Sequence, residues 1–298
     1  MTPLRGSFSG RFLNAFGSFL LSLGLFLHPA AGGDNLVPSG DFESQPDAQA
    51  WGADTVCRQN PEEAHSGDHS LRVLYKNWVL SPELIEIDPN GIYRLSSFFK
   101  TPAVSASGQE QEKVRYLLGF HMYDADGALI GGMSVLPVEG TERKLVAEAS
   151  EGSSEIRMEG EPWERRMLDP NTPYDAIAFD VKSDYSDLPN SANYVIESIT
   201  ADRDATIVRL RKPLTQSYPT GTLVRQHAHV DYVHVAGEAT PEWTESFIEV
   251  NGISEPGQVA RDKFWPGTKK IQVGVIGGGG STNETDFLID DVSLIENK

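Results

Sequence analysis

Short runs of alternating apolar and polar residues, separated by turn signals, constrain this sequence most. Alternation with a period of two is typical of strands that bury one face. No window longer than about 12 residues has apolar positions at helical spacing. Turns are indicated at DPNG (88–91), DADG (124–127), YPTG (218–221) and WPGT (265–268), and the chain has 18 prolines and 28 glycines. The pattern therefore predicts an all-β sandwich or barrel, with strands in the runs 69–75, 92–100, 114–124, 174–182, 205–211, 231–237, 245–252 and 269–278.

The first 33 residues are typical of a secretory signal peptide. Arg5 and Arg11 precede an apolar run at 12–27, and small residues follow near Ala31. A membrane anchor is the alternative, but the run is shorter than the ~20 apolar residues that span a bilayer, and no cysteine stands there to carry a lipid. We therefore expect a secreted protein, in the extracellular space, on the cell surface or in the periplasm. Its mature chain of about 265 residues would have no membrane span, and its oligomeric state is not indicated.

The charge and the cysteine content limit the possible partners. The formal charge of −18 becomes about −20 without the leader, which argues against nucleic acid and anionic membranes as partners. Neutral sugars and cations remain, or the carboxylates only keep the protein soluble. Cys57 is the single cysteine, so an internal disulfide is excluded and the core or metal ions must stabilise the fold. No base adjoins Cys57 to activate it as a nucleophile.

The middle of the chain differs from its two ends. Shorter strand-like runs follow Gly140 and end near Gly237, after which PEWTESFIEVNGI (241–253) resumes the longer pattern. We therefore expect one discontinuous outer domain, residues 34–135 and 238–298, with an inserted β module at 136–237. The insertion has the size of a small domain.

Four segments of the outer part, in order, carry a family resemblance. They are NLVPSGDFES (35–44), Trp51 with AHSGDHSLRV (64–73), IEIDPNGIYRLSSFFKT (85–101) and FLIDDVSLIE (287–296). The outer part resembles the jelly-roll carbohydrate-binding modules of the galactose-binding-like superfamily. The resemblance implies a jelly-roll β-sandwich interrupted by a second small β domain, and a secreted protein that binds a polysaccharide or glycoconjugate without catalysis. The superfamily serves many functions, so it indicates the fold more strongly than the ligand.

The resemblance also implies that the first and last strands lie together, with a structural Ca²⁺ between them. Hard cations take six to eight oxygens from carboxylates and carbonyls. Strand alternation places Asp290 and Asp291 on opposite faces, both largely apolar, so either carboxylate could close the ligand shell. The alternative is a set of solvated turn acids. The implied metal residues are Asp41, Glu43, Ser66, Asp68, Asp290 and Asp291.

Aromatic and polar side chains of the middle strands are the candidate sugar site. Sugar rings stack on aromatic faces, and polar side chains bind their hydroxyls. On the concave face of the resembled family, residues around Tyr116, Phe120 and Tyr123 would be exposed. Trp51 and Trp243 are expected to be buried in the core instead. The carbohydrate-binding candidates are Trp78, Arg115, Tyr116, His121 and Tyr123.

GTLVRQHAHVDYVH (221–234) gives an enzymatic alternative. His227 and His229 would share one face of a strand, which is a usable metal pair, and the segment is similar to the first cupin motif. His234 stands where that motif has Glu, and no second motif follows. A polysaccharide lyase would use Arg225, His227 and Tyr232 as neutraliser and base, without a supporting motif. An amphipathic strand with a wet polar face is the simpler interpretation, so no catalytic residue is assigned.

Overall fold

The computed structural model describes residues 33–52, 57–60, 63–74, 78–108, 110–169, 172–230, 232–258, 260–277 and 286–297. Almost all of the predicted leader lies outside these residues. Among them, no helix is long and apolar enough to cross a membrane. Antiparallel strands dominate the described part, which confirms the all-β prediction.

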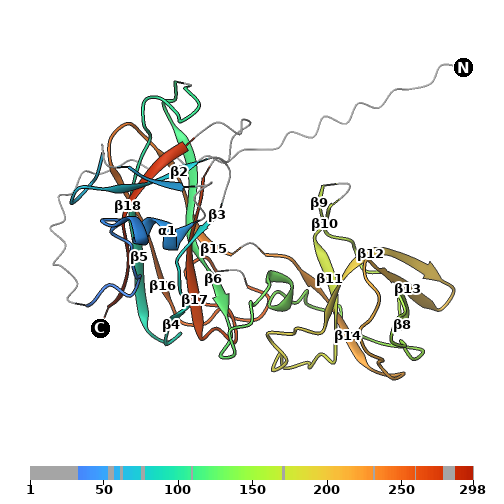
Figure 1. Cartoon of the computed structure of the whole chain (residues 1–298). Helices are drawn as coiled ribbons and strands as arrows, with labels where there is room; N and C mark the ends of the chain where they lie inside the picture. Colours follow the sequence, from blue (N-terminus) through green and yellow to red (C-terminus); the bar gives the residue numbers. More distant parts are fainter. Residues whose placement is uncertain are drawn as a thin grey trace, which may run out of the picture. The chain divides into compact units, whose positions relative to one another are not determined.

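Two antiparallel sheets form the sandwich of the outer part (Figure 1). The first has the order β1-β2-β18-β5-β16, with bounds β1 Cys57–Asn60, β2 Ser70–Leu74, β18 Asp286–Asn297, β5 Ile92–Lys100 and β16 Thr244–Asn251. The second has the order β15-β6-β17-β3, and β4 also pairs with β17. Its bounds are β15 Val233–Ala239, β6 Val114–Tyr123, β17 Lys270–Gly277, β3 Trp78–Leu80 and β4 Ile85–Glu86.

One hydrophobic core includes side chains from both of these sheets. Alternate residues of the strands supply it, as period-two patterning requires. Phe99 of β5 stacks on Tyr116 of β6 with ring centroids 3.7 Å apart and nearly parallel planes. The cluster includes Val73, Tyr93, Leu95, Phe99, Leu118, Phe120, Ile271, Val273, Val275, Ile289 and Leu294.

The two ends of the described chain lie side by side, as predicted. The Leu36 N–H donates to the Leu294 carbonyl over 2.9 Å, and the Val292 N–H donates to the Gly40 carbonyl over 2.8 Å. The Asn35 side chain bridges the same strands, since its amide donates to the Val292 carbonyl at 3.1 Å and its oxygen accepts from the Leu294 N–H at 3.0 Å. Val292 of β18 and Phe42 of the first segment belong to the same buried hydrophobic cluster.

A short helix, α1 (Gln45–Trp51), follows the first segment, where no helix was predicted. Ser44 caps it: the Ser44 oxygen accepts from the Asp47 N–H, and the Asp47 carboxylate accepts from the Ser44 N–H. This reciprocal pair is a capping box, which satisfies donors at a helix start. Trp51 is buried as predicted, although in a helix, and its indole donates to the Pro38 carbonyl over 3.2 Å.

A third sheet with its own core forms most of the predicted insertion. Its order is β7-β14-β11-β12-β13-β8, with bounds β7 Arg143–Lys144, β14 Leu223–Ala228, β11 Asp175–Phe179, β12 Asn193–Asp202, β13 Ala205–Leu210 and β8 Glu155–Glu159. Beside it, β9 (Met167–Asp169) pairs with β10 (Thr172–Pro173). The second cluster includes Met158, Ile177, Phe179, Val208 and Tyr218. We propose that the two clusters mark two domains; the predicted boundary at residue 237 falls within β15, which pairs with β6.

The 3₁₀ turn η1 (Gly132–Ser134) joins the two cores. The Asn190 N–H donates to the Ser134 carbonyl over 2.8 Å, and the Asn193 amide donates to the Ser134 hydroxyl over 3.0 Å. A His227 ring nitrogen lies 2.8 Å from the Met133 carbonyl. These bonds hold the connecting segment against residues of the third-sheet region.

Candidate functional site

The outer face of the β15-β6-β17-β3 sheet holds most of the predicted sugar-binding residues. Alternation along β6 sends Arg115, His121 and Tyr123 outward, where Arg115 is exposed and the other two are partly exposed. Tyr116 and Phe120 have the opposite parity and are buried, at 4% and 1% exposure. The expectation that these two are exposed is therefore wrong, because they point into the core.

Two paired glycines form the middle of this face. Gly119 of β6 lies opposite Gly274 of β17, and both are buried. A Cβ atom added to Gly119 would lie 2.1 Å from the Val233 carbonyl oxygen and 2.8 Å from the His234 Cα. The backbone of β15 therefore fills the place that a side chain at residue 119 would take, and only glycine fits there.

Neutral hydrogen-bonding groups flank the glycine pair on one side. Gln272 lies opposite His121 in the register. The Tyr123 hydroxyl donates to the Gln272 side-chain oxygen over 2.9 Å, and the Gln272 amide donates to the Ser81 carbonyl over 2.8 Å. Burial raises the pKa of Tyr123 and lowers the pKa of His121. Both side chains are therefore uncharged at neutral pH, and Gln272 is held in one orientation.

Aromatic rings continue from His121 toward the connecting segment. The His121 ring stacks on Tyr232 with centroids 5.4 Å apart, and Tyr232 lies 4.9 Å from the His234 ring. A cavity of about 280 Å³ opens here, lined by His121, Tyr232, His229 and Trp265 among others. Rings and hydrogen-bonding atoms therefore meet at one end of the sheet face.

The remaining predicted sugar residues lie at the margins of this face. Arg115 is paired with Glu238 in the β6–β15 register. The backbone of Trp78, in β3, pairs with that of Ile276 in β17. The side chain of Trp78 lies outside the described part. Trp243 was expected to be buried but is only partly so, with its ring centroid 6.0 Å from the Lys100 ammonium.

The predicted metal residues gather where the chain ends meet. Glu43 accepts from the backbone N–H groups of Asp68 and His69, at 3.0 and 3.2 Å. Asp290 accepts from the His65 N–H at 2.7 Å. Asp291 contacts the His65 ring at 2.7 Å and accepts from the hydroxyl of Ser66, also at 2.7 Å.

A β-bulge brings both final aspartates to the loop 65–69. The β18–β5 register shifts between Asp290 and Ser293, and Asp291 has φ +48°. The alternation predicted for these two residues is interrupted by this bulge. Asp290 is fully buried, and burial, followed by the negative charge of Asp291, raises its pKa to about 6.

The fit of these residues to a cation is partial. Among the residues with a described position, no three His, Cys, Asp or Glu side chains form a metal-ligating group. Glu43, Asp290 and Asp291 supply the oxygens that Ca²⁺ prefers, but they are turned toward N–H and O–H donors of the loop. The side chain of Asp41, which was also predicted as a metal ligand, is exposed.

The His227–His229 pair expected on one strand face does not form. His227 lies in β14 and is fully buried. One of its ring nitrogens contacts the Met133 carbonyl, and the other accepts from the Arg225 guanidinium at 3.2 Å. His229 lies beyond the end of β14, with its ring edge-on to Tyr174 at 5.0 Å. Since both nitrogens of His227 are engaged, the strand offers no metal-ligating pair.

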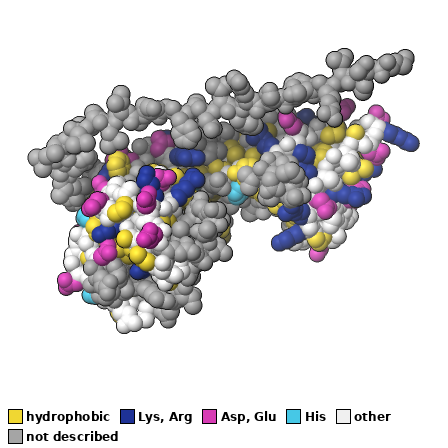
Figure 2. Space-filling model, turned by 90° about the horizontal axis from the view of Figure 1, so that it is seen from above, with side chains coloured by type: hydrophobic (Ala, Val, Ile, Leu, Met, Phe, Trp, Pro, Cys, Tyr) yellow, Lys and Arg dark blue, Asp and Glu magenta, His cyan; other side chains and the backbone are white. Residues whose placement is uncertain are grey.

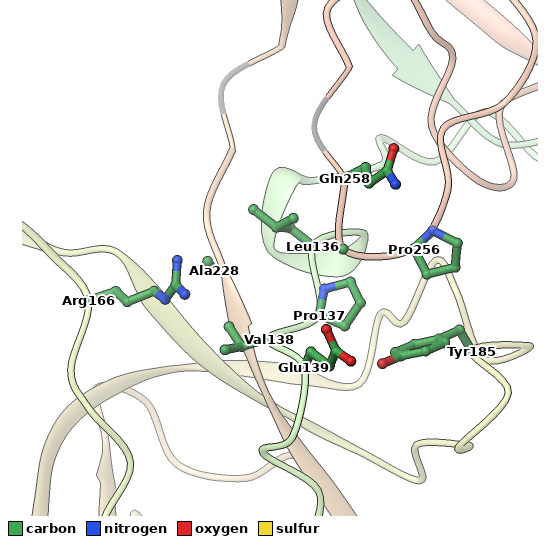
Figure 3. A pocket seen from close by; sticks show the side chains of 10 residues that line it. Leu136, Pro137, Val138, Glu139, Arg166, Tyr185, Ala228, Pro256 and Gln258 are labelled. Carbon is green, nitrogen blue, oxygen red and sulfur yellow. The ribbon is translucent and has the colours of Figure 1, made fainter.

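A larger cavity of about 630 Å³ lies beside the connecting segment (Figure 3). Its lining comes from residues 136–139 after η1, from Arg166 and Tyr185 of the third-sheet region, and from the 256–258 turn. Sequence reasoning missed this cavity. The only local signal was an aromatic residue, Tyr185, inside the polar loop SDYSDLPNS (183–191).

Comparisons with known proteins give only distant structural similarity. No protein-family profile matches the sequence, and no curated protein matches it. The chain is similar to the CBM22-1 xylan-binding domain of Paenibacillus barcinonensis Xyn10C, with 11% identity, a TM-score of 0.38, and coverage of 91% of this chain and 99% of that one. It is also similar to a family 16 carbohydrate-binding module, with 13% identity, a TM-score of 0.35, and coverage of 88% and 100%.

Proposed function

We propose that this protein binds a polysaccharide or glycoconjugate on the outer face of the β15-β6-β17-β3 sheet. The observation that carries the proposal is the group of neutral hydrogen-bonding side chains and aromatic rings that lies beside the Gly119–Gly274 pair on this face. No charged group has to be desolvated at His121, Tyr123 or Gln272 when a neutral ligand binds.

The chemistry of these groups fits a sugar chain. A sugar ring has apolar faces that stack on aromatic rings, which His121 and Tyr232 supply. Its hydroxyls both donate and accept, and neutral imidazole, phenol and amide groups do the same. Because Gln272 is already oriented by Tyr123 and the Ser81 carbonyl, little rotamer freedom is lost on binding.

We also propose that the protein is exported and that Ca²⁺ binds where its chain ends meet. Glu43, Asp290 and Asp291 would hold the ion, together with carbonyls of the 66–68 loop. Support comes from the burial of Asp290 beside a second carboxylate. A buried negative charge is costly without a counter-charge, and a cation would provide one while tying the first segment to β18.

Affinity electrophoresis tests the sugar-binding proposal. The purified protein is run through gels that contain soluble β-glucan, xylan, mannan or galactan. We expect retardation in at least one gel, and loss of that retardation in the double variant His121→Ala/Gln272→Ala. Phe247→Ala is the matched control, because Phe247 is an exposed aromatic residue on the other sheet, in β16.

The outcome is decisive when the variants are folded. Circular dichroism at 25 °C must give the same spectrum for the wild type and both variants. Retardation that survives His121→Ala/Gln272→Ala contradicts the assigned face. Retardation on no neutral or acidic polysaccharide of a broad panel contradicts the function itself.

A further inference from the structure

The cavity lined by residues 136–139, Arg166, Tyr185 and 256–258 is separate from the sheet face and has features of a binding site. Its volume of about 630 Å³ falls within the range of small-molecule sites. Pro137, which is buried, and Pro256, which is exposed, form apolar parts of the wall. Figure 3 shows both rings facing the same space as the side chain of Tyr185.

Tyr185 is held rigidly in this wall. Its ring lies over the guanidinium of Arg225, with 4.7 Å between the ring centroid and the guanidinium carbon. Arg225 is fully buried, and it donates to the Asp187 carboxylate at 2.9 Å and to the Lys182 carbonyl at 3.1 Å. The backbone of Tyr185 has φ +59°, a conformation that non-glycine residues adopt at a cost. Such strain is often maintained at ligand-binding positions.

The loop that carries Tyr185 is closed by its own hydrogen bonds. The Asp187 carboxylate accepts from the Lys182 N–H at 3.1 Å and from the Asn190 amide at 2.9 Å. The same amide donates to the Phe179 carbonyl at 2.9 Å. The ring therefore has its position before any ligand arrives, which reduces the entropy lost on binding.

Four polar groups around the cavity have no hydrogen-bond or ion-pair partner within the part of the chain that the structure describes. They are the side chains of Glu139, Arg166 and Gln258 and the hydroxyl of Tyr185, and the first three side chains are exposed. In Figure 3 the Glu139 carboxylate and the Tyr185 hydroxyl point into the same space, with Gln258 on another side of it and Arg166 beyond Val138. These groups are free to bind a ligand.

The charges restrict the ligand class. Glu139 would repel an anion and Arg166 would repel a cation, so a neutral molecule fits the pair. The ligand must offer an apolar face to Tyr185 and the prolines, together with hydroxyls that donate to a carboxylate and accept from a guanidinium. A neutral sugar ring meets both conditions.

We propose that this cavity is a second carbohydrate site, which takes one unit of a neutral glycan. The proposal rests on the function proposed above, because that function makes a sugar chain the ligand of this protein. Tyr185 and the prolines contact one face of the ring, and Glu139, Arg166 and Gln258 bind its hydroxyls. Two sites on one chain raise the overall affinity for a long polymer when the polymer reaches both.

Isothermal titration tests the site with neutral hexasaccharides of glucose, xylose, mannose and galactose. The pocket variant is Glu139→Ala/Arg166→Ala, whose exposed side chains can be removed without breaking a described contact. The face variant is His121→Ala/Gln272→Ala. Tyr185→Gly removes the ring and suits the positive φ, whereas Tyr185→Phe keeps the ring and is its control.

We expect the pocket variant and Tyr185→Gly to lose at least about tenfold in affinity for one of two binding events, while Tyr185→Phe loses much less. The face variant should weaken the other event. If the pocket variant binds like the wild type while the face variant is weakened, the second site is refuted and the proposed function stands. If only the pocket variant is weakened, the sheet-face site is refuted and the cavity is supported. If the wild-type protein binds none of the four hexasaccharides, the cavity proposal is refuted for these sugars. Retardation of the protein by a longer polysaccharide would still support the proposed function.

Discussion

Replacement of Arg225 by methionine should destabilise the third-sheet region strongly. The guanidinium is fully buried, and it contacts the carboxylate of Asp187, whose side chain is 6% exposed. It also donates to the Lys182 carbonyl and to His227. Methionine has a similar length but no donor, so the change would leave a buried carboxylate without its cation.

The size of the effect follows from that unpaired charge. Breaking a buried ion pair by removing one partner costs about 3–5 kcal/mol. At about 2–4 °C per kcal/mol for a protein of this size, the melting temperature should fall by on the order of 10 °C. Since Tyr185 lies on the same guanidinium, its ring should lose its fixed position as well.

Urea unfolding followed by circular dichroism measures this cost. The matched control is Arg209→Met, because the Arg209–Glu155 pair lies on the same sheet but is 63% and 45% exposed; that change should cost at most about 1 kcal/mol. The double variant Arg225→Met/Asp187→Asn should be less destabilised than the two single changes added together, because it removes the orphaned charge. If Arg225→Met costs no more than Arg209→Met, the reasoning about this buried pair is wrong.

Three further predictions concern pH, calcium and Gly119. The pKa of His227 is held near 4, mainly by burial, against 6.5 in the unfolded chain; the unfolded state therefore binds more protons between these values, and up to about 3 kcal/mol of stability should be lost as the pH falls from 6.5 to 4. The raised pKa of Asp290 acts in the opposite sense in nearly the same window, so the loss is measured as the difference in urea midpoints between the wild type and His227→Gln; an equal pH dependence of the two would refute the assignment. Calcium at 100 times its dissociation constant should add about 2.7 kcal/mol, seen as a higher melting temperature than in EDTA, with the gain absent in Asp290→Asn; equal melting in both buffers would exclude the site. Gly119→Ala should lower the melting temperature, because its Cβ would meet backbone atoms at 2.1 Å, whereas a melting temperature equal to the wild type would show that the strands can separate there.

Strand positions were predictable because apolar alternation fixes both the strand and its buried face. The run 92–100 coincides with β5, and 114–124 matches β6 to within one residue. The helix α1 was missed because it has only 7 residues, which is too short for a helical period to show. Its capping box, Ser44 to Asp47 with Pro46 between them, was the available signal.

The candidate site was predictable only in part. The run VRYLLGFHMYD (114–124) itself places Tyr116 and Phe120 on one face and His121 and Tyr123 on the other, so strict parity would have removed Tyr116 from the candidates. The Gly119–Gly274 pairing depends on the register of two distant strands, which no local pattern encodes. The bulge at Asp291 likewise breaks an alternation that the sequence displays intact.

The cavity around Tyr185 lies beyond sequence reasoning for a related reason. Its lining comes from segments near residues 137, 166, 185 and 257, and only the folded chain brings them together. Figure 2 shows positive and negative side chains intermixed on the view it presents. A charge run in the sequence could not have distinguished Glu139 and Arg166 from this background.

The central claim is that the sheet face around Gly119 and Gly274 binds a sugar chain. The most direct test is an NMR titration of the protein with an oligosaccharide taken from the polysaccharide that retards it. Amide chemical shifts are measured at each step of the titration. The account predicts saturable shifts in β6, β17 and β15, with the outward positions His121 and Gln272 among the largest. Shifts confined to the opposite sheet, β2, β5, β16 and β18, would contradict it.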